Sequence, residues 1–96
     1  MVYWIITADV ENPKGEAEGI GHLPQRPGWI ARYAMNQITP EILKALPYRF
    51  RVLDSDGIPY YLGFASEEGF APKDWAMANA GCTAIEYANG DQWEML

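Results

Sequence analysis

Two aspartates stand one residue apart in the stretch LDSDGIPYY, and carboxylates at this spacing occur in calcium-binding loops. If Asp54 and Asp56 held the third and fifth positions of such a loop, Val52 would be first and Gly63 twelfth. Neither of those side chains can bind a metal ion. The stretch is therefore predicted to form a turn with Gly57 in the left-handed conformation, and no metal or other cofactor is expected.

Cys82 and His22 are the single cysteine and the single histidine of the chain, and a thiol with an imidazole is the minimum for nucleophilic catalysis. A zinc site would need carboxylates to complete the ligand set. Cys82 falls in a predicted strand, where a small thiol behaves as a buried apolar group. His22 falls in a glycine-rich stretch that lacks the Gly-Lys-Ser/Thr ending of a phosphate loop. We therefore expect no catalytic residues and a protein that is not an enzyme.

Arginine and aromatic residues offer a binding surface instead, because both types are enriched at interaction hot spots. If the apolar side chains of a predicted hairpin face the core, Arg49, Arg51 and Tyr61 share its outer face. Trp29 and Trp75 each stand next to an irregular segment that contains proline, and they are further candidates for a partly exposed anchor. The alternative is a solvated sheet face on which the arginines stack on Tyr61 or pair with nearby acids.

The net charge of −6 lies in the second half of the chain, where residues 52–96 carry one Lys or Arg against eight Asp and Glu. Residues 1–51 carry six against five. An acidic surface disfavours direct binding to nucleic acid, which requires a basic face, but it permits a basic partner. The residues assigned to this hypothetical acidic surface are Asp54, Asp56, Glu67, Glu68, Glu86, Asp91 and Glu94.

Three functions are ranked on these observations. A non-catalytic module that binds a protein partner or has a regulatory role comes first. An acidic mimic of nucleic acid comes second; it would inhibit a basic nucleic-acid-binding protein, for example in a host-defence complex. A small enzyme that uses Cys82 and His22 comes last.

No apolar run approaches the roughly 20 residues of a membrane span, and the N-terminus lacks the order of a signal peptide. We therefore expect a cytoplasmic protein that does not bind membranes. A single cysteine does not call for an oxidising compartment. A chain of 96 residues is predicted to form one domain over residues 1–96.

The fold predicted for this domain is α+β, with a small and mainly antiparallel sheet. Its parts are an N-terminal strand, two hairpins and one or two short helices. The clearest helix spans residues 39–46, with Thr39 as its N-cap and Pro47 as its stop. The other expected elements are a strand at 2–8, a Gly- and Pro-rich loop without a central strand at 11–28, a strand at 29–35, the hairpins at 48–64 and 82–95, and a short helical turn from Pro72 to Gly81.

The register of the first hairpin is predicted from the distribution of its apolar residues. A three-residue loop ending at Gly57 pairs Phe50 with Leu62 and Val52 with Tyr60, so that all large apolar residues share one face. A two-residue loop would place the apolar residues on opposite faces.

The second hairpin is treated in the same way. A three-residue loop ending at Gly90 pairs Ile85 with Trp93, whereas a two-residue Asn-Gly loop would mix the two faces. Glu86 and Glu94 are then expected near each other on the outer face of this hairpin.

Several motifs also resemble a group of small bacterial and phage-type proteins of unknown function. The similar stretches are FRVLDSDGIPYYLGF, FAP and NAGCTAIEY, where the group has Phe-Arg-x-x-Asp-Asp-Asp-Gly, Tyr-Tyr-x-Gly, Ala-Pro-Leu and Asn-Ala-Gly-Cys-Thr-x-Ile-x-Tyr. The similarity covers most of residues 50–96 and departs from the pattern at Ser55, at Lys73 and through residues 25–46. It implies a bacterial, phage or plasmid source, and it transfers neither an activity nor a site residue.

Overall fold

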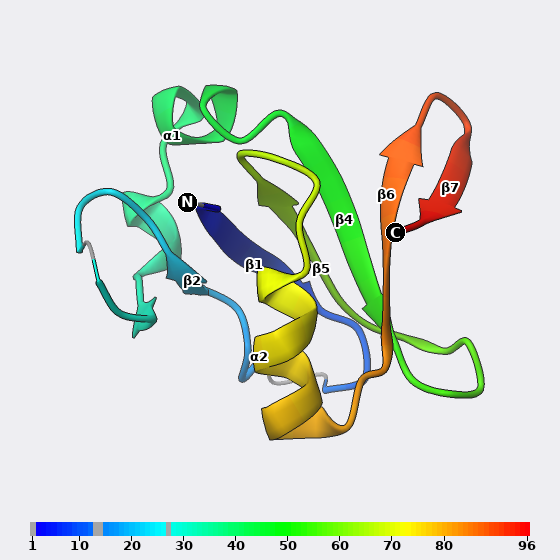
Figure 1. The fold of residues 1–96 in the computed structure, drawn as a ribbon. Helices are drawn as coiled ribbons and strands as arrows, with labels where there is room; N and C mark the ends of the chain where they lie inside the picture. Colours follow the sequence, from blue (N-terminus) through cyan, green and yellow to red (C-terminus); the bar gives the residue numbers. More distant parts are fainter. Residues whose placement is uncertain (1, 13–14, 27) are drawn as a thin grey trace.

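The computed structural model describes residues 2–12, 15–26 and 28–96. Its strands form one seven-stranded antiparallel sheet with the order β3-β2-β1-β5-β4-β6-β7, which confirms the predicted α+β class (Figure 1). The strands are β1 Trp4–Asp9, β2 Ile20–His22, β3 Ala31–Arg32, β4 Tyr48–Leu53, β5 Pro59–Ala65, β6 Ala84–Asn89 and β7 Gln92–Met95. The helices are a 3-10 turn at Met35–Gln37, α1 at Pro40–Lys44 and α2 at Ala71–Ala80.

The sheet has two different faces. The helix face is the one that α2 covers (Figure 1). Its core includes Trp4, Phe50 and Tyr61. The opposite face is packed near Ile5, against a second cluster made with Leu23, Tyr33 and Leu46. Further along this opposite face, toward β6 and β7, Arg49 is exposed and Arg51, Leu62 and Trp93 are half-buried. We call the surface formed by these four residues the open face.

Both helices follow from their end signals. The Thr39 hydroxyl accepts the Ile42 N–H at 3.4 Å, as predicted for an N-cap. Predicted as a short turn, α2 has ten residues and ends where Gly81 takes φ 74. None of the helices in the described residues is long and apolar enough to cross a membrane.

The N-terminal third contains more sheet than the sequence predicted. The strand predicted at 2–8 is confirmed as β1, but β2 lies inside the loop predicted at 11–28, between β1 and β3. The prediction that no central strand forms there was wrong. Gly21 explains the difference, because a Cβ at this position would lie 2.3 Å from the Trp4 carbonyl oxygen. The strand predicted at 29–35 is reduced to the two residues of β3.

The predicted register of the β4–β5 hairpin was wrong over most of its length. Phe50 pairs with Gly63 and Val52 with Tyr61, and a bulge then shifts the register so that Leu53 pairs with Pro59. The predicted pairing therefore holds at the last pair alone. Phe50 and Leu62 lie on opposite faces because both faces of this sheet bury apolar side chains, so the demand for a single apolar face did not apply.

The turn itself was predicted correctly, because the Asp54 N–H donates to the Ile58 carbonyl at 3.0 Å and leaves the three loop residues 55–57 between them. Gly57 has φ 78, and its N–H bonds to the Asp54 carbonyl at 3.1 Å. One carboxylate oxygen of Asp54 accepts the N–H groups of Asp56 at 2.9 Å and Ile58 at 3.0 Å. Asp54 thus organises its own turn.

The β6–β7 hairpin takes a register that neither considered loop predicted. Asn89 pairs with Gln92 around a two-residue Gly90-Asp91 loop, in which Gly90 has φ 62. Trp93 pairs with Ala88 rather than with Ile85. Consequently Trp93 lies on the open face with Glu86, while Glu94 lies on the opposite face of the hairpin, so the expected proximity of the two glutamates was wrong.

Candidate functional site

Two β-bulges turn polar and aromatic side chains toward the same end of the helix face. In β1, Ile6 pairs with Gly63, Ala8 with Leu62 and Asp9 with Tyr61, so Thr7 is an extra residue. Without this bulge, side chains three residues apart, such as Ile6 and Asp9, would point to opposite faces. The β4–β5 bulge falls at Tyr60, between the pairs of Tyr61 and Pro59.

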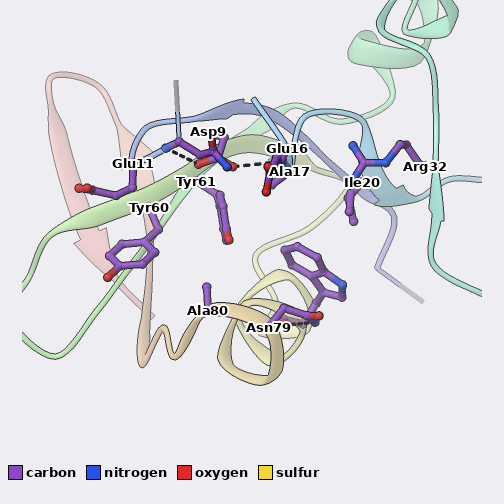
Figure 2. Close-up of a pocket in the computed structure, with 12 residues that line it drawn as sticks. Asp9, Glu11, Glu16, Ala17, Ile20, Arg32, Tyr60, Tyr61, Asn79 and Ala80 are labelled. Atoms are coloured by element: carbon purple, nitrogen blue, oxygen red, sulfur yellow. Dashed lines mark hydrogen bonds between the residues drawn. The ribbon is translucent and has the colours of Figure 1, made fainter. Parts of the chain in front are cut away.

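These side chains line a cleft of about 490 Å³ that opens to solvent between the end of β1, the following loop, β5 and α2 (Figure 2). Its volume lies within the usual range of ligand sites, roughly 300–1,000 Å³. The lining residues are Asp9, Glu11, Asn12, Glu16, Ala17, Ile20, Arg32, Tyr60, Tyr61, Trp75, Asn79 and Ala80. Three carboxylates and three aromatic rings thus surround one space.

Asp9 fixes the loop that forms one wall of the cleft. Its two carboxylate oxygens accept the N–H groups of Asn12 and Ala17, each at 3.1 Å (Figure 2). A further bond, from Gly19 N–H to the Ile6 carbonyl at 2.8 Å, holds the end of the loop against β1. Asp9 is therefore a positioning residue, and Glu11 and Glu16 project from the backbone that it holds.

The aromatic wall is continuous with the core. The ring of Trp75 lies 5.7 Å from Tyr61 and 6.1 Å from Trp4, between centroids. The Tyr60 and Tyr61 rings lie 6.2 Å apart and nearly perpendicular, at 88°. Tyr61 is 9% exposed and Trp75 is half-buried. Packing thus holds these rings in place with one side of the wall facing the cleft.

Negatively charged side chains surround the cleft. Glu11 and Glu16 are exposed, and neither forms an ion pair with another residue that the structure describes. The pKa of Tyr60 is raised, most strongly by the charge of Asp54 and less by burial and by the charge of Glu11. Burial raises the pKa of Tyr61, and the charge of Asp9 adds to this shift. Both phenols are therefore neutral at pH 7, and the lining residues contribute three carboxylates and one guanidinium.

The residues of the predicted binding surface are divided between the two faces. Tyr61 does not share the outer face with Arg49 and Arg51, because its register places it in the core of the helix face. Trp75 lines the cleft. Trp29 is 70% exposed and lies in neither cluster of buried residues.

Arg49 and Arg51 do come together, but on Trp93. Their guanidinium carbons lie 5.4 Å and 4.5 Å from the centroid of its ring. The Arg51 Nε donates to the Glu86 carboxylate at 2.6 Å. Sequence reasoning identified the two arginines and missed the tryptophan, because the predicted register placed Trp93 beside Ile85.

The seven residues of the hypothetical acidic surface do not gather. Asp54 and Asp56 lie in the turn beyond Leu53, at one end of β4, whereas Glu67 and Glu68 follow β5 at the other end. Asp91 lies in the β6–β7 turn, and Glu86 and Glu94 lie on opposite faces, as described above. The acids that do converge, Asp9, Glu11 and Glu16, come from the half of the chain whose charge is nearly balanced.

One sequence signal could have found those acids. Asp9 and Glu11 follow directly after the predicted first strand, at the start of a long Gly- and Pro-rich loop, and loops of that length are often functional. The position of Tyr60 beside these acids could not be predicted without knowing the β4–β5 bulge.

Cys82 and His22 have separate environments. Cys82 is fully buried, and burial raises the pKa of its thiol to about 11, so the nucleophilic thiolate is disfavoured at neutral pH. His22 packs edge-on against Tyr3 at 5.5 Å, and its Nε2 accepts the Gly28 N–H at 3.4 Å. In the described part of the chain, no three His, Cys, Asp or Glu side chains are grouped as metal ligands.

No family model, curated protein or solved structure matches this chain. The resemblance to small bacterial and phage-type proteins therefore stays a prediction.

Proposed function

We propose that the protein is a non-catalytic interaction module that binds a basic segment of a protein partner, with an arginine or lysine side chain in the cleft. The observation that carries this proposal is the convergence of three carboxylates and three aromatic rings around one open space. Cations are attracted to the faces of aromatic rings within about 6 Å, and charged hydrogen bonds to carboxylates add to this attraction.

The composition of the lining favours a cation over an anion. Among the described lining residues the one guanidinium is that of Arg32, which donates through Nη1 to the Glu18 carbonyl at 3.0 Å, so part of its donor capacity is used. Asp9 uses both of its oxygens for backbone N–H groups. Glu16, on the Tyr61 side of the cleft, and Glu11, on the Tyr60 side, therefore supply the acceptors for an incoming cation (Figure 2).

A segment of a protein fits this cleft better than a free small molecule. The cleft opens broadly to solvent, so a small amine would keep much of its surface hydrated there. A polypeptide can bury one side chain in the cleft and add backbone contacts along the rim. The acidic net charge of −6 also accelerates the encounter with a basic partner.

A non-catalytic role is preferred because the lining contains no histidine, cysteine or lysine among its described residues, and its two tyrosines have raised pKa values. The acidic-mimic alternative would need a continuous acidic surface, and the seven residues assigned to it lie in separate places.

The proposal is tested by a nuclear magnetic resonance titration with the peptide acetyl-Gly-Gly-Arg-Gly-Gly-amide. We expect shifts at Tyr60, Tyr61 and the Trp75 indole. A matched peptide with neutral citrulline in place of arginine is expected to bind at least about fivefold more weakly. The double variant Glu11→Gln/Glu16→Gln should weaken arginine-peptide binding by about fivefold to tenfold.

The matched control is Glu68→Gln/Glu94→Gln, which removes the same charge outside the cleft and should leave affinity within about twofold. Equal losses in the two double variants would show general attraction to an acidic protein rather than a site. That result, or equal binding of the citrulline peptide, would contradict the proposal.

A further inference from the structure

We infer that the open face contains a second, separate site, at Arg49, for the C-terminal carboxylate and last apolar side chain of a peptide. The site is a small cavity of about 160 Å³ on the other side of the sheet from α2. Its lining residues are Thr7, Ala8, Arg49, Phe50, Leu62, Gly63, Phe64 and Trp93.

The two arginines of the open face differ in whether their guanidinium groups form an ion pair with a described residue. Arg51 is held by Glu86 at 2.6 Å, and its guanidinium carbon lies over the Trp93 ring at 4.5 Å from the centroid. Arg49 also stacks on Trp93, at 5.4 Å, but forms no ion pair with any residue in the described ranges. Its guanidinium is thus a positive group, oriented by an aromatic ring, whose planar fork of donors remains for a ligand.

The apolar lining of the cavity indicates which chemical group lies next to the carboxylate of the ligand. Leu62 and Phe64 are half-buried and, with one side of Trp93, give the cavity an apolar lining beside the Arg49 guanidinium. The ligand therefore carries a carboxylate next to an apolar group. The C-terminal residue of a peptide has this chemistry, since its carboxylate and its side chain share one Cα.

The volume favours a chain end over a complete small ligand. A cavity of about 160 Å³ is below the usual range for ligand pockets, so it accepts about one side chain while the rest of the ligand stays outside. A free amino acid fits poorly as well, because its ammonium group would lie near Arg49. This inference does not depend on the proposed function, since the two sites share no lining residue.

The test uses acetyl-Gly-Gly-Phe with a free C-terminal carboxylate, the same peptide as its C-terminal amide, and 3-phenylpropionate. Binding is followed by the indole N–H resonance of Trp93, assigned with Trp93→Phe. We expect the free-acid peptide to bind at least about tenfold more tightly than the amide. It should also bind more tightly than 3-phenylpropionate, which lacks the peptide backbone.

Arg49→Gln should weaken binding of the free-acid peptide by about tenfold, and Arg49→Lys should recover only part of it. Arg26→Gln is the matched control, because Arg26 also stacks on an aromatic ring, Tyr33, at 5.4 Å. It should leave the affinity unchanged. Equal binding of acid and amide, no saturable shift of the Trp93 resonance, an equal loss in Arg26→Gln, or tighter binding of 3-phenylpropionate would each overturn the inference.

Discussion

The helix face and the open face of this sheet use the same residue types in opposite ways. On the helix face, Trp75 is fixed by neighbouring rings, and carboxylates project beside it. On the open face, Trp93 is contacted by two arginines. One tryptophan belongs to the helix that packs on the sheet, whereas charged side chains cover the other. The difference teaches that an aromatic residue contributes more to stability where rings of the core pack against it than where charged side chains alone cover it.

The largest expected effect separates the two tryptophans. Trp75→Ala should lower the free energy of unfolding by about 3 kcal/mol, because it opens a space beside Trp4 and Tyr61 in the main core. Trp93→Ala should lower it by only about 1 kcal/mol, since it removes a half-buried ring and its two cation contacts. Urea unfolding of both variants measures the difference, and similar losses would remove the distinction between the faces.

A buried thiol in the core of the helix face should lower the stability of the protein at alkaline pH. Burial raises the pKa of Cys82 to about 11, from an ordinary value of 9.0, so the folded state favours the neutral thiol. Its contribution is complete below pH 9 and is lost as the pH rises toward 11. At pH 10 the loss should be about 1 kcal/mol.

Urea unfolding at pH 7.5 and pH 10 measures this loss, and Cys82→Ala is the control. Tyr61 and Tyr87 also have pKa values that burial raises, so the variant should keep part of the pH dependence. An identical pH dependence in the variant and the wild type would show that the thiol makes no contribution.

The smallest expected effect belongs to the open face. Glu86→Gln removes the charge that pairs with Arg51, and it should cost about 0.5 kcal/mol, because the pair is partly solvated. Glu94→Gln is the comparison on the other face of the hairpin, where the Asn89 amide donates to Glu94 at 2.8 Å, and glutamine can keep that bond. Thermal unfolding compares the two. A loss of several kcal/mol in Glu86→Gln would place the open face among the stabilising regions.

Local signals were readable from the sequence and long-range ones were not. Thr39 as a helix cap, Gly81 as a helix end and Gly57 as a left-handed turn residue each depend on a few neighbouring positions. The sheet registers depend on more than alternation. The predicted β4–β5 register required each residue to pair with one residue and all large apolar residues to share one face. The bulge at Tyr60 breaks the first condition, and apolar packing on both faces of the sheet breaks the second.

The candidate site was predictable in part for the same reason. Arg49, Arg51 and Tyr61 were selected from residue type and a predicted common face, and Trp75 from residue type and a neighbouring proline. All four line a cavity, although the common face was wrong. Their partners were not found, because net charge counted along the chain does not reveal which carboxylates converge in space. Asp9 and Tyr61 are far apart in sequence and become neighbours through the β1–β5 pairing.

The bulge at Thr7 also affects how the chain can change in length. Thr7 is the unpaired residue between the pairs of Ile6 and Ala8, so deleting it would leave regular alternation with Asp9 still opposite Tyr61. The β1 strand could therefore lose a residue at this point without moving the wall of the cleft. A deletion of this one residue is thus a change in chain length under which Asp9 would keep its place in the wall.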